Sequence, residues 1–197
     1  MELNVGGFVP YSTVNGPGKR AVIWVQGCPL RCTGCFNPEF QPFLSRSLIP
    51  VDVIADEISD IEGIEGVTFS GGEPFCQAAA LAELGRELRN NGFNVVTFSG
   101  FPLRFLRDNK RRSWKSLLEV TDLLVAGPYD SHRSSPHPLL SSLNQELVFL
   151  SPEFEGRVES TPTTPLTEFV IRSGGAITIT GFPGENMHSV LSEKGRD

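Results

Sequence analysis

The sequence contains no apolar run that could cross a membrane. A membrane helix needs roughly 18 consecutive apolar residues, and every apolar run in this chain is far shorter. The first residues also lack the apolar segment after a basic start that marks a secretory signal. An excess of positive charge is missing too, because 17 Lys and Arg stand against 23 Asp and Glu. These absences predict a cytoplasmic protein with no membrane partner and no nucleic-acid partner.

Cysteine is scarce, with four residues in the chain, but three of them lie within eight positions. Cys28, Cys32 and Cys35 form a C-x3-C-x2-C run, and in a reducing compartment such a group holds metal more often than disulfides. Three thiolates on one loop can bind three irons of a 4Fe–4S cluster and leave the fourth iron open. The alternative is a zinc site completed by Cys76 or a histidine, although zinc sites usually repeat C-x2-C pairs at longer separations. We expect Cys76 to be buried by packing.

Hydrophobic periodicity predicts alternating strands and helices. Apolar runs predict strands over 21–26, 67–70, 93–98, 122–126 and 147–150, and helical spacing predicts helices over 51–61 and 77–90, with a partly helical basic stretch over 102–120. Two further strands over 168–172 and 176–180 flank Ser173-Gly174-Gly175, which indicates a hairpin. This order is typical of an α/β fold with a parallel sheet. The chain is shorter than the about 250 residues of a full β/α barrel, so we expect an open sheet or a partial barrel.

A second motif, Gly71-Gly72-Glu73-Pro74, follows the predicted strand over 67–70. Glycines at a strand end let the backbone approach a ligand without a Cβ atom in the way. The Glu73 carboxylate is a suitable acceptor for an ammonium group. The alternative interpretation is a tight turn followed by a first-turn helix carboxylate. Ser99 and Asn144 are further candidates, because polar residues near strand ends often contact ligands in α/β proteins.

The cysteine loop after the first strand and the Gly-Gly-Glu-Pro motif after the second together resemble the radical S-adenosylmethionine (SAM) superfamily. The resemblance implies a partial (open) β/α barrel with a small C-terminal β-hairpin. It also implies one domain over 1–197, with a core over about 15–150 and an extension over about 151–197. Its cofactors would be SAM and a 4Fe–4S cluster held by the three clustered cysteines. The implied SAM-binding residues are Phe36, packing near the adenine, and Gly71, Gly72, Glu73 and Pro74.

Three less specific motifs, at 16–20, 122–129 and 141–145, resemble motifs of glycyl-radical activating enzymes, and especially of the anaerobic ribonucleotide reductase activating protein. This implies reductive cleavage of SAM to a 5′-deoxyadenosyl radical, which abstracts hydrogen from a glycine of a partner glycyl-radical enzyme. The electron would come from a flavodoxin or ferredoxin. Ala126 departs from the pattern, because relatives usually carry Asp there, and in some activases carboxylates at this strand end help to bind a monovalent cation near SAM. Either this chain lacks the cation site, or Asp122 or Asp130 compensates.

Two other functions fit parts of the pattern. One is a radical SAM enzyme that modifies a small molecule or peptide, as in 7-deazapurine or peptide natural-product synthesis. The other is a non-catalytic iron–sulfur or zinc binding module, which would leave the Gly-Gly-Glu-Pro motif without a role. The basic run within 104–115 is either a solvated helix face or a docking patch for an acidic partner. Its cations are Arg104, Arg107, Lys110, Arg111, Arg112 and Lys115.

Overall fold

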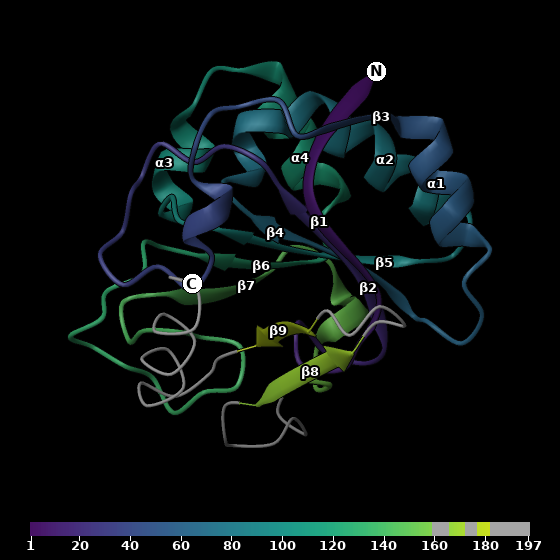
Figure 1. Cartoon of the computed structure of the whole chain (residues 1–197). Coiled ribbons are helices and arrows are strands. Elements are labelled where there is room, and N and C mark those ends of the chain that lie inside the picture. The colour runs from purple at the N-terminus through teal and green to yellow at the C-terminus, as the bar shows by residue number, and fades with distance from the viewer. Residues whose placement is uncertain (159–165, 172–176, 182–197) are drawn as a thin grey trace, which may run out of the picture.

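The protein folds around a central sheet of seven strands, in a computed structural model that describes residues 1–158, 166–171 and 177–181 (Figure 1). The strands are β1 (Glu2–Ser12), β2 (Arg20–Val25), β3 (Ser47–Pro50), β4 (Gly66–Gly71), β5 (Asn94–Ser99), β6 (Leu123–Ala126) and β7 (Glu146–Phe149). The helices are α1 (Val51–Ser59), α2 (Ala78–Asn90), α3 (Leu103–Asp108) and α4 (Arg112–Val120), with short 3-10 turns η1 (Pro38–Phe40), η2 (Pro74–Gln77) and η3 (Pro152–Phe154). A separate pair, β8 (Thr167–Ile171) and β9 (Ile177–Gly181), follows.

The sheet is parallel at its centre and antiparallel at both sides. Its strand order is β3-β1-β2-β4-β5-β6-β7, so β3 and β7 are its edges. Strands β2, β4, β5 and β6 run parallel, whereas β1 and β7 run antiparallel to their neighbours. Parallel neighbours need a long crossover connection, and a short loop permits only antiparallel pairing. The predicted α/β order with a parallel sheet is confirmed, within a mixed and open sheet.

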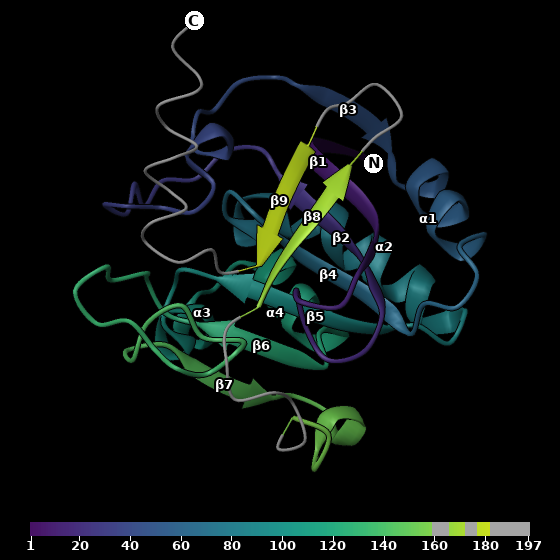
Figure 2. The same ribbon diagram turned by 60° about the horizontal axis from the view of Figure 1, so that its bottom comes forward.

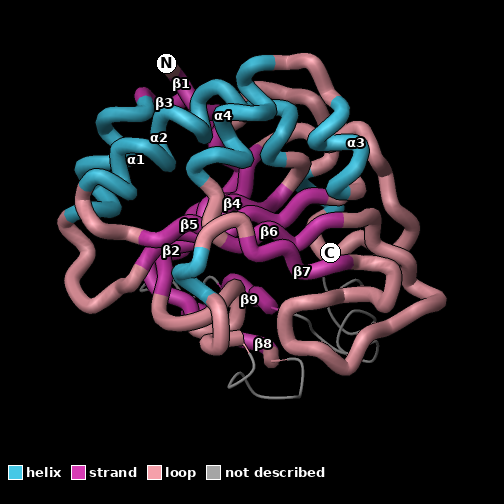
Figure 3. Tube along the Cα trace, turned by 180° about the vertical axis from the view of Figure 1, so that it is seen from behind, coloured by secondary structure: helices cyan, strands magenta, loops and turns pink. Residues whose placement is uncertain are grey.

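Helices α1, α2 and α4 cover one face of the sheet, and β8 and β9 lie on the other side (Figure 3). Both α1 and α2 bury one apolar stripe, which includes Ile58 on α1 and Leu84 on α2. Gly85 lets α2 approach α4 closely, because a Cβ atom there would lie 2.8 Å from the Val120 side chain. Every residue of β2 is buried, which explains its continuous apolar run. Among the described residues, no helix is both long enough and apolar enough to span a membrane.

Two strands, β1 and β3, were not predicted by periodicity. In β1 the glycine pair Gly6-Gly7 interrupts the alternation, and the pairing with β2 shifts register between Val5 and Gly7. A bulge of this kind breaks the period of two that identifies a strand in a sequence. The core nevertheless reaches into β1, because Leu3 and Val5 are buried with the helix-side residues.

The predicted C-terminal hairpin is confirmed, since β8 and β9 pair antiparallel, although its turn lies outside the described residues. The hairpin lies across β1 and β2 on the face away from the helices (Figure 2). Val170 packs against the cluster that contains Trp24. The Asn15 amide donates a 2.8 Å hydrogen bond to Thr180 Oγ1, and the Thr13 amide donates to Glu168. These contacts hold β9 beside the carboxyl ends of the central strands.

Candidate functional site

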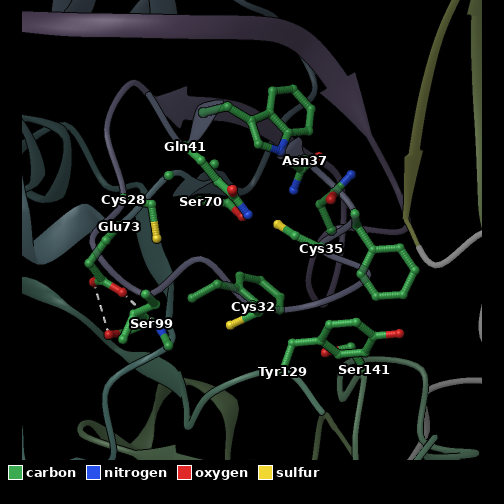
Figure 4. A pocket seen from close by; sticks show the side chains of 18 of the residues that line it. Cys28, Cys32, Cys35, Asn37, Gln41, Ser70, Glu73, Ser99, Tyr129 and Ser141 are labelled. Carbon is green, nitrogen blue, oxygen red and sulfur yellow. Dashed lines mark hydrogen bonds between the residues drawn. The ribbon is translucent and has the colours of Figure 1, made fainter. Parts of the chain in front are cut away.

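A pocket opens where the parallel strands end, which is the edge where α/β sheets bind ligands. Figure 4 shows its lining residues, with the three clustered cysteines around one hollow. Loops after β2, β4, β5 and β6 form most of the wall, and β9 closes one side through Ile179, Thr180 and Gly181. The lining includes these residues predicted from sequence: Cys28, Cys32, Cys35, Phe36, Gly71, Gly72, Glu73 and Ser99.

The cysteine loop is shaped by its backbone. It closes on itself through a 2.8 Å hydrogen bond from the Gly27 amide to the Phe40 carbonyl. Within the loop, Arg31 and Gly34 adopt φ values of 50° and 71°, which lie in the left-handed region that bends a chain sharply. The bends bring all three cysteines to the pocket, where each is half-buried and free of disulfides.

The three thiols at the pocket are suited to bind iron. Burial raises the pKa of Cys28 and the pKa of Cys32. A backbone N–H of Tyr129 that donates to the Cys32 sulfur offsets part of the rise in the pKa of Cys32. Bound iron displaces the thiol protons and stabilises the thiolates. Among the described residues, no three Cys, His, Asp or Glu side chains meet closely enough to hold one metal ion. A 4Fe–4S cluster takes each thiolate on a different iron, and all three cysteines line the same pocket.

Glu73 ties the ends of two strands together. Its side chain is fully buried, and its Oε1 atom accepts hydrogen bonds from the Phe75 amide at 3.0 Å and the Ser99 hydroxyl at 2.9 Å. Its Oε2 atom accepts from the Gly100 amide at 2.9 Å. Burial raises the pKa of Glu73 to about 7, against the lowering effect of these donors. A carboxylate offers about four acceptor positions, so one remains for the predicted ammonium group.

The two glycines of the motif are required by close packing against β2 and the loop that follows it. Gly71 has a φ of 101°, and a Cβ atom there would lie 2.5 Å from the Val25 nitrogen. At Gly72 a Cβ atom would lie 2.4 Å from the Gly27 carbonyl oxygen. Close packing therefore accounts for both glycines, and approach of a ligand to this backbone stays a prediction.

The remaining candidates divide between the pocket wall and its support. Phe36 lines the pocket with its ring centroid 4.8 Å from that of Tyr129. Pro74 is buried behind the wall, where it begins η2. Asn144 is outside the lining and donates to the Pro128 carbonyl at 2.6 Å.

Gln145, the next residue in the chain, lines the pocket instead of Asn144. Its side-chain amide donates to the Gly127 carbonyl at 3.0 Å. Sequence reasoning missed Gln145 and Tyr129, although the Gly127-Pro128 turn after a strand was a usable signal.

Two expectations about nearby residues are corrected by the structure. Cys76 is exposed and not buried, because η2 turns Phe75 into the core and Cys76 outward. Asp122 does not compensate for Ala126, since it precedes β6 at the end of the strand remote from the pocket, where it accepts from the Val95 amide at 2.8 Å. Asp130 is likewise outside the lining of this pocket.

Ser99→Ala is expected to destabilise the protein by about 1 kcal/mol, because a buried hydrogen bond to Glu73 is lost. The Ser99 hydroxyl also accepts from the Phe101 amide at 3.1 Å, and that donor would lose its partner. Denaturant unfolding of the variant and the wild type measures the difference. An unchanged free energy of unfolding would show that the hydroxyl is dispensable to the strand ends.

Comparison with known proteins identifies the family of the chain. A family model described as a 4Fe-4S single cluster domain matches residues 14–148. An inferred glycyl-radical enzyme activating enzyme of Haemophilus influenzae is 35% identical over 117 residues, which is 58% of this chain and 42% of that protein. The pyruvate formate-lyase-activating enzyme of Staphylococcus aureus (strain USA300) is 38% identical over 122 residues, which is 57% of this chain and 47% of that protein.

The matched parts thus make up less than half the length of these two relatives. The family match covers most of the chain, including the three clustered cysteines and the Gly-Gly-Glu-Pro motif. The chain therefore belongs to the 4Fe-4S single cluster domain family, and its resemblance to radical SAM enzymes that activate glycyl-radical enzymes is confirmed.

Proposed function

We propose that the protein is a radical SAM enzyme that activates a glycyl-radical enzyme. The observation that carries the proposal is the convergence of the three clustered cysteines and the Glu73 network on one pocket at the carboxyl ends of parallel strands. When bound, the 4Fe–4S cluster and SAM supply reductive cleavage to methionine and a 5′-deoxyadenosyl radical, which takes a hydrogen atom from a glycine. The open sheet is then interpreted as the partial β/α barrel of this superfamily.

The chain's own residues bind, orient and shield the cofactors. Cys28, Cys32 and Cys35 hold three irons through their thiolates. The free acceptor position of Glu73 takes the methionine ammonium of SAM, and the Phe36 ring packs near the adenine. Strand β9 lines one side of the pocket, and a pocket that excludes water protects a reactive radical from side reactions.

The substrate assignment is supported by the names of the two relatives, both of which are activating enzymes. A glycine in a glycyl-radical enzyme is accordingly the proposed hydrogen donor, and a flavodoxin or ferredoxin is the proposed electron donor. The alternatives of a small-molecule substrate and of a non-catalytic module find no support in these relatives. Free thiols at the pocket suit a reducing compartment, so the cytoplasm is the proposed location.

Anaerobic reconstitution with iron and sulfide, followed by dithionite and SAM, tests the chemistry. We expect 5′-deoxyadenosine, measured by mass spectrometry, and a glycyl radical in an added glycyl-radical enzyme, measured by electron paramagnetic resonance. A loaded cluster that yields neither product with the partner present would contradict the proposal and favour a binding module. Deoxyadenosine without any glycyl radical would contradict the proposed substrate and favour a small molecule or peptide.

A further inference from the structure

Helices α3 and α4, whose place in the fold is seen in Figure 1, belong to a basic segment of this otherwise acidic protein. Residues 101–120 carry six cations and two acids, whereas the whole chain has a net charge of −6. All six cations are exposed, and none takes part in an ion pair with another described residue. We define the α3–α4 surface by these cations and Phe105: Arg104, Phe105, Arg107, Lys110, Arg111, Arg112 and Lys115.

The centre of the α3–α4 surface is aromatic. Phe105 is 49% exposed, and its ring centroid lies 5.0 Å from that of Phe101 and 5.9 Å from that of Trp114. The Arg111 guanidinium lies over the Trp114 ring at 5.4 Å. An apolar centre with a charged rim is the usual composition of a protein interface, and packed aromatic rings make ordered anchors.

This surface backs directly onto the cysteine pocket. Phe101 follows Gly100, whose amide binds Glu73, and Trp114 packs edge-on against Phe75 with centroids 5.3 Å apart. Arg111 and Trp114 also line a hollow that contains Cys76.

Cys76 lies between the two sites, because its amide donates to the Glu73 carbonyl and its side chain shares a hollow with Arg111. Partial desolvation of its thiol, together with the charges of Glu73 and Cys28, raises the pKa of Cys76 to about 11. Arg111 acts on the same thiol in the opposite direction. Cys76 therefore stands between a proposed cluster ligand and the basic surface.

We propose that the α3–α4 surface docks a small acidic protein that carries one electron, and that this carrier reduces the cluster. The inference rests on the proposed function, which requires one electron per cleavage. The reduced carrier loses one electron and the cluster gains it, with no bond or proton transferred. Complementary charge raises association rates 10-fold to 1,000-fold and loses this effect in salt. A compact carrier can contact the basic surface alone, whereas a long polyanion would also meet the acidic remainder of the chain.

The test compares two double charge reversals in the anaerobically reconstituted protein. Arg107→Glu/Lys110→Glu alters the α3–α4 surface, and Arg46→Glu/Arg133→Glu makes the same change in charge at exposed positions elsewhere. The probe is an acidic flavodoxin in its fully reduced form. Stopped-flow loss of the cluster's visible absorbance measures electron transfer, and calorimetric titration measures binding.

We expect the first variant to slow reduction by flavodoxin at least about tenfold at low ionic strength and to weaken binding in parallel. The control variant should keep both values near those of the wild type, and high salt should remove the difference between them. Phe105→Ser should weaken binding without a change in net charge. Equal rates in the first variant and the wild type, or an equal loss in the control, would overturn the proposal.

Dithionite separates this proposal from the proposed function. Reduction by dithionite, and the deoxyadenosine that follows, should be the same in both variants and the wild type. If dithionite does not drive cleavage of SAM but flavodoxin still binds, the proposed function is overturned and the assignment of the docking surface is retained. Tighter binding of duplex DNA or of phosphatidylserine vesicles than of flavodoxin, lost in the first variant, would overturn the docking proposal in favour of another polyanion.

Discussion

Cys32→Ala is expected to abolish assembly of the iron–sulfur cluster. Cys32 lies at the middle of the cysteine loop and lines the pocket, and with two thiolates left the cluster would lose one of its three anchored irons. Iron and sulfide content after anaerobic reconstitution, together with visible absorbance, measures the loss. We expect the variant to fall to background and to produce no deoxyadenosine.

Cys76→Ser is the matched control for this experiment. Cys76 is the fourth cysteine of the chain, but it is exposed and outside the pocket lining. Its substitution should leave the iron content at the wild-type value. Full iron content in Cys32→Ala would contradict the assignment of Cys32 as a ligand. Loss of iron in Cys76→Ser would identify Cys76 as a ligand.

Glu73→Gln is expected to weaken SAM binding strongly while the cluster still assembles. The substitution removes the negative charge proposed to hold the ammonium group. It also replaces one acceptor oxygen by an NH2 donor. That donor would face either the Gly100 amide, or the Phe75 amide and the Ser99 hydroxyl, all of which are donors to Glu73. An unpaired buried donor costs about 1–3 kcal/mol, so the variant should also be less stable. Titration of the reconstituted protein with SAM gives the affinity, and an unchanged affinity would show that Glu73 only joins the strand ends.

The pH dependence of stability gives a second readout for Glu73. Its pKa in the folded protein, about 7, lies above the ordinary value of 4.5, so the folded state binds the proton more tightly than the unfolded state. The resulting stabilisation is fully present below about pH 4.5 and is lost as the pH rises through 7, with a total of about 3 kcal/mol. Urea unfolding of the cluster-free chain at pH 5 and pH 8 should show this loss in the wild type and not in Glu73→Gln. The same pH dependence in both proteins would assign it to other groups.

The elements with regular periodicity could be predicted from sequence. Helix α2 and strand β2 follow their apolar patterns within one or two residues. Strand β1 could not, because its Gly6-Gly7 pair and register shift remove the alternation. The antiparallel pairing of β1 with β2 and β3 could not be predicted either, because it depends on which strands meet in the folded protein.

The site was predictable where its residues are close in sequence. The cysteine spacing and the Gly-Gly-Glu-Pro motif are local patterns, and both reach the pocket. The network of Glu73 was not predictable, because Ser99 and Gly100 come from the next strand and meet it only through the parallel register. The exposure of Cys76 was missed for a related reason, since the direction of a short 3-10 turn is decided by packing.

The antiparallel N-terminal strand changes how the folding unit should be defined. The family match begins at residue 14, yet β1 lies before that point and pairs with β2 on one side and β3 on the other. A chain trimmed to the match would lose Leu3, Val5 and Val9 from the buried residues. It would also leave the unpaired edge of β2 open to strands of other molecules. Aggregation of such a fragment would then reflect the missing strand, so functional work on this protein should retain its first twelve residues.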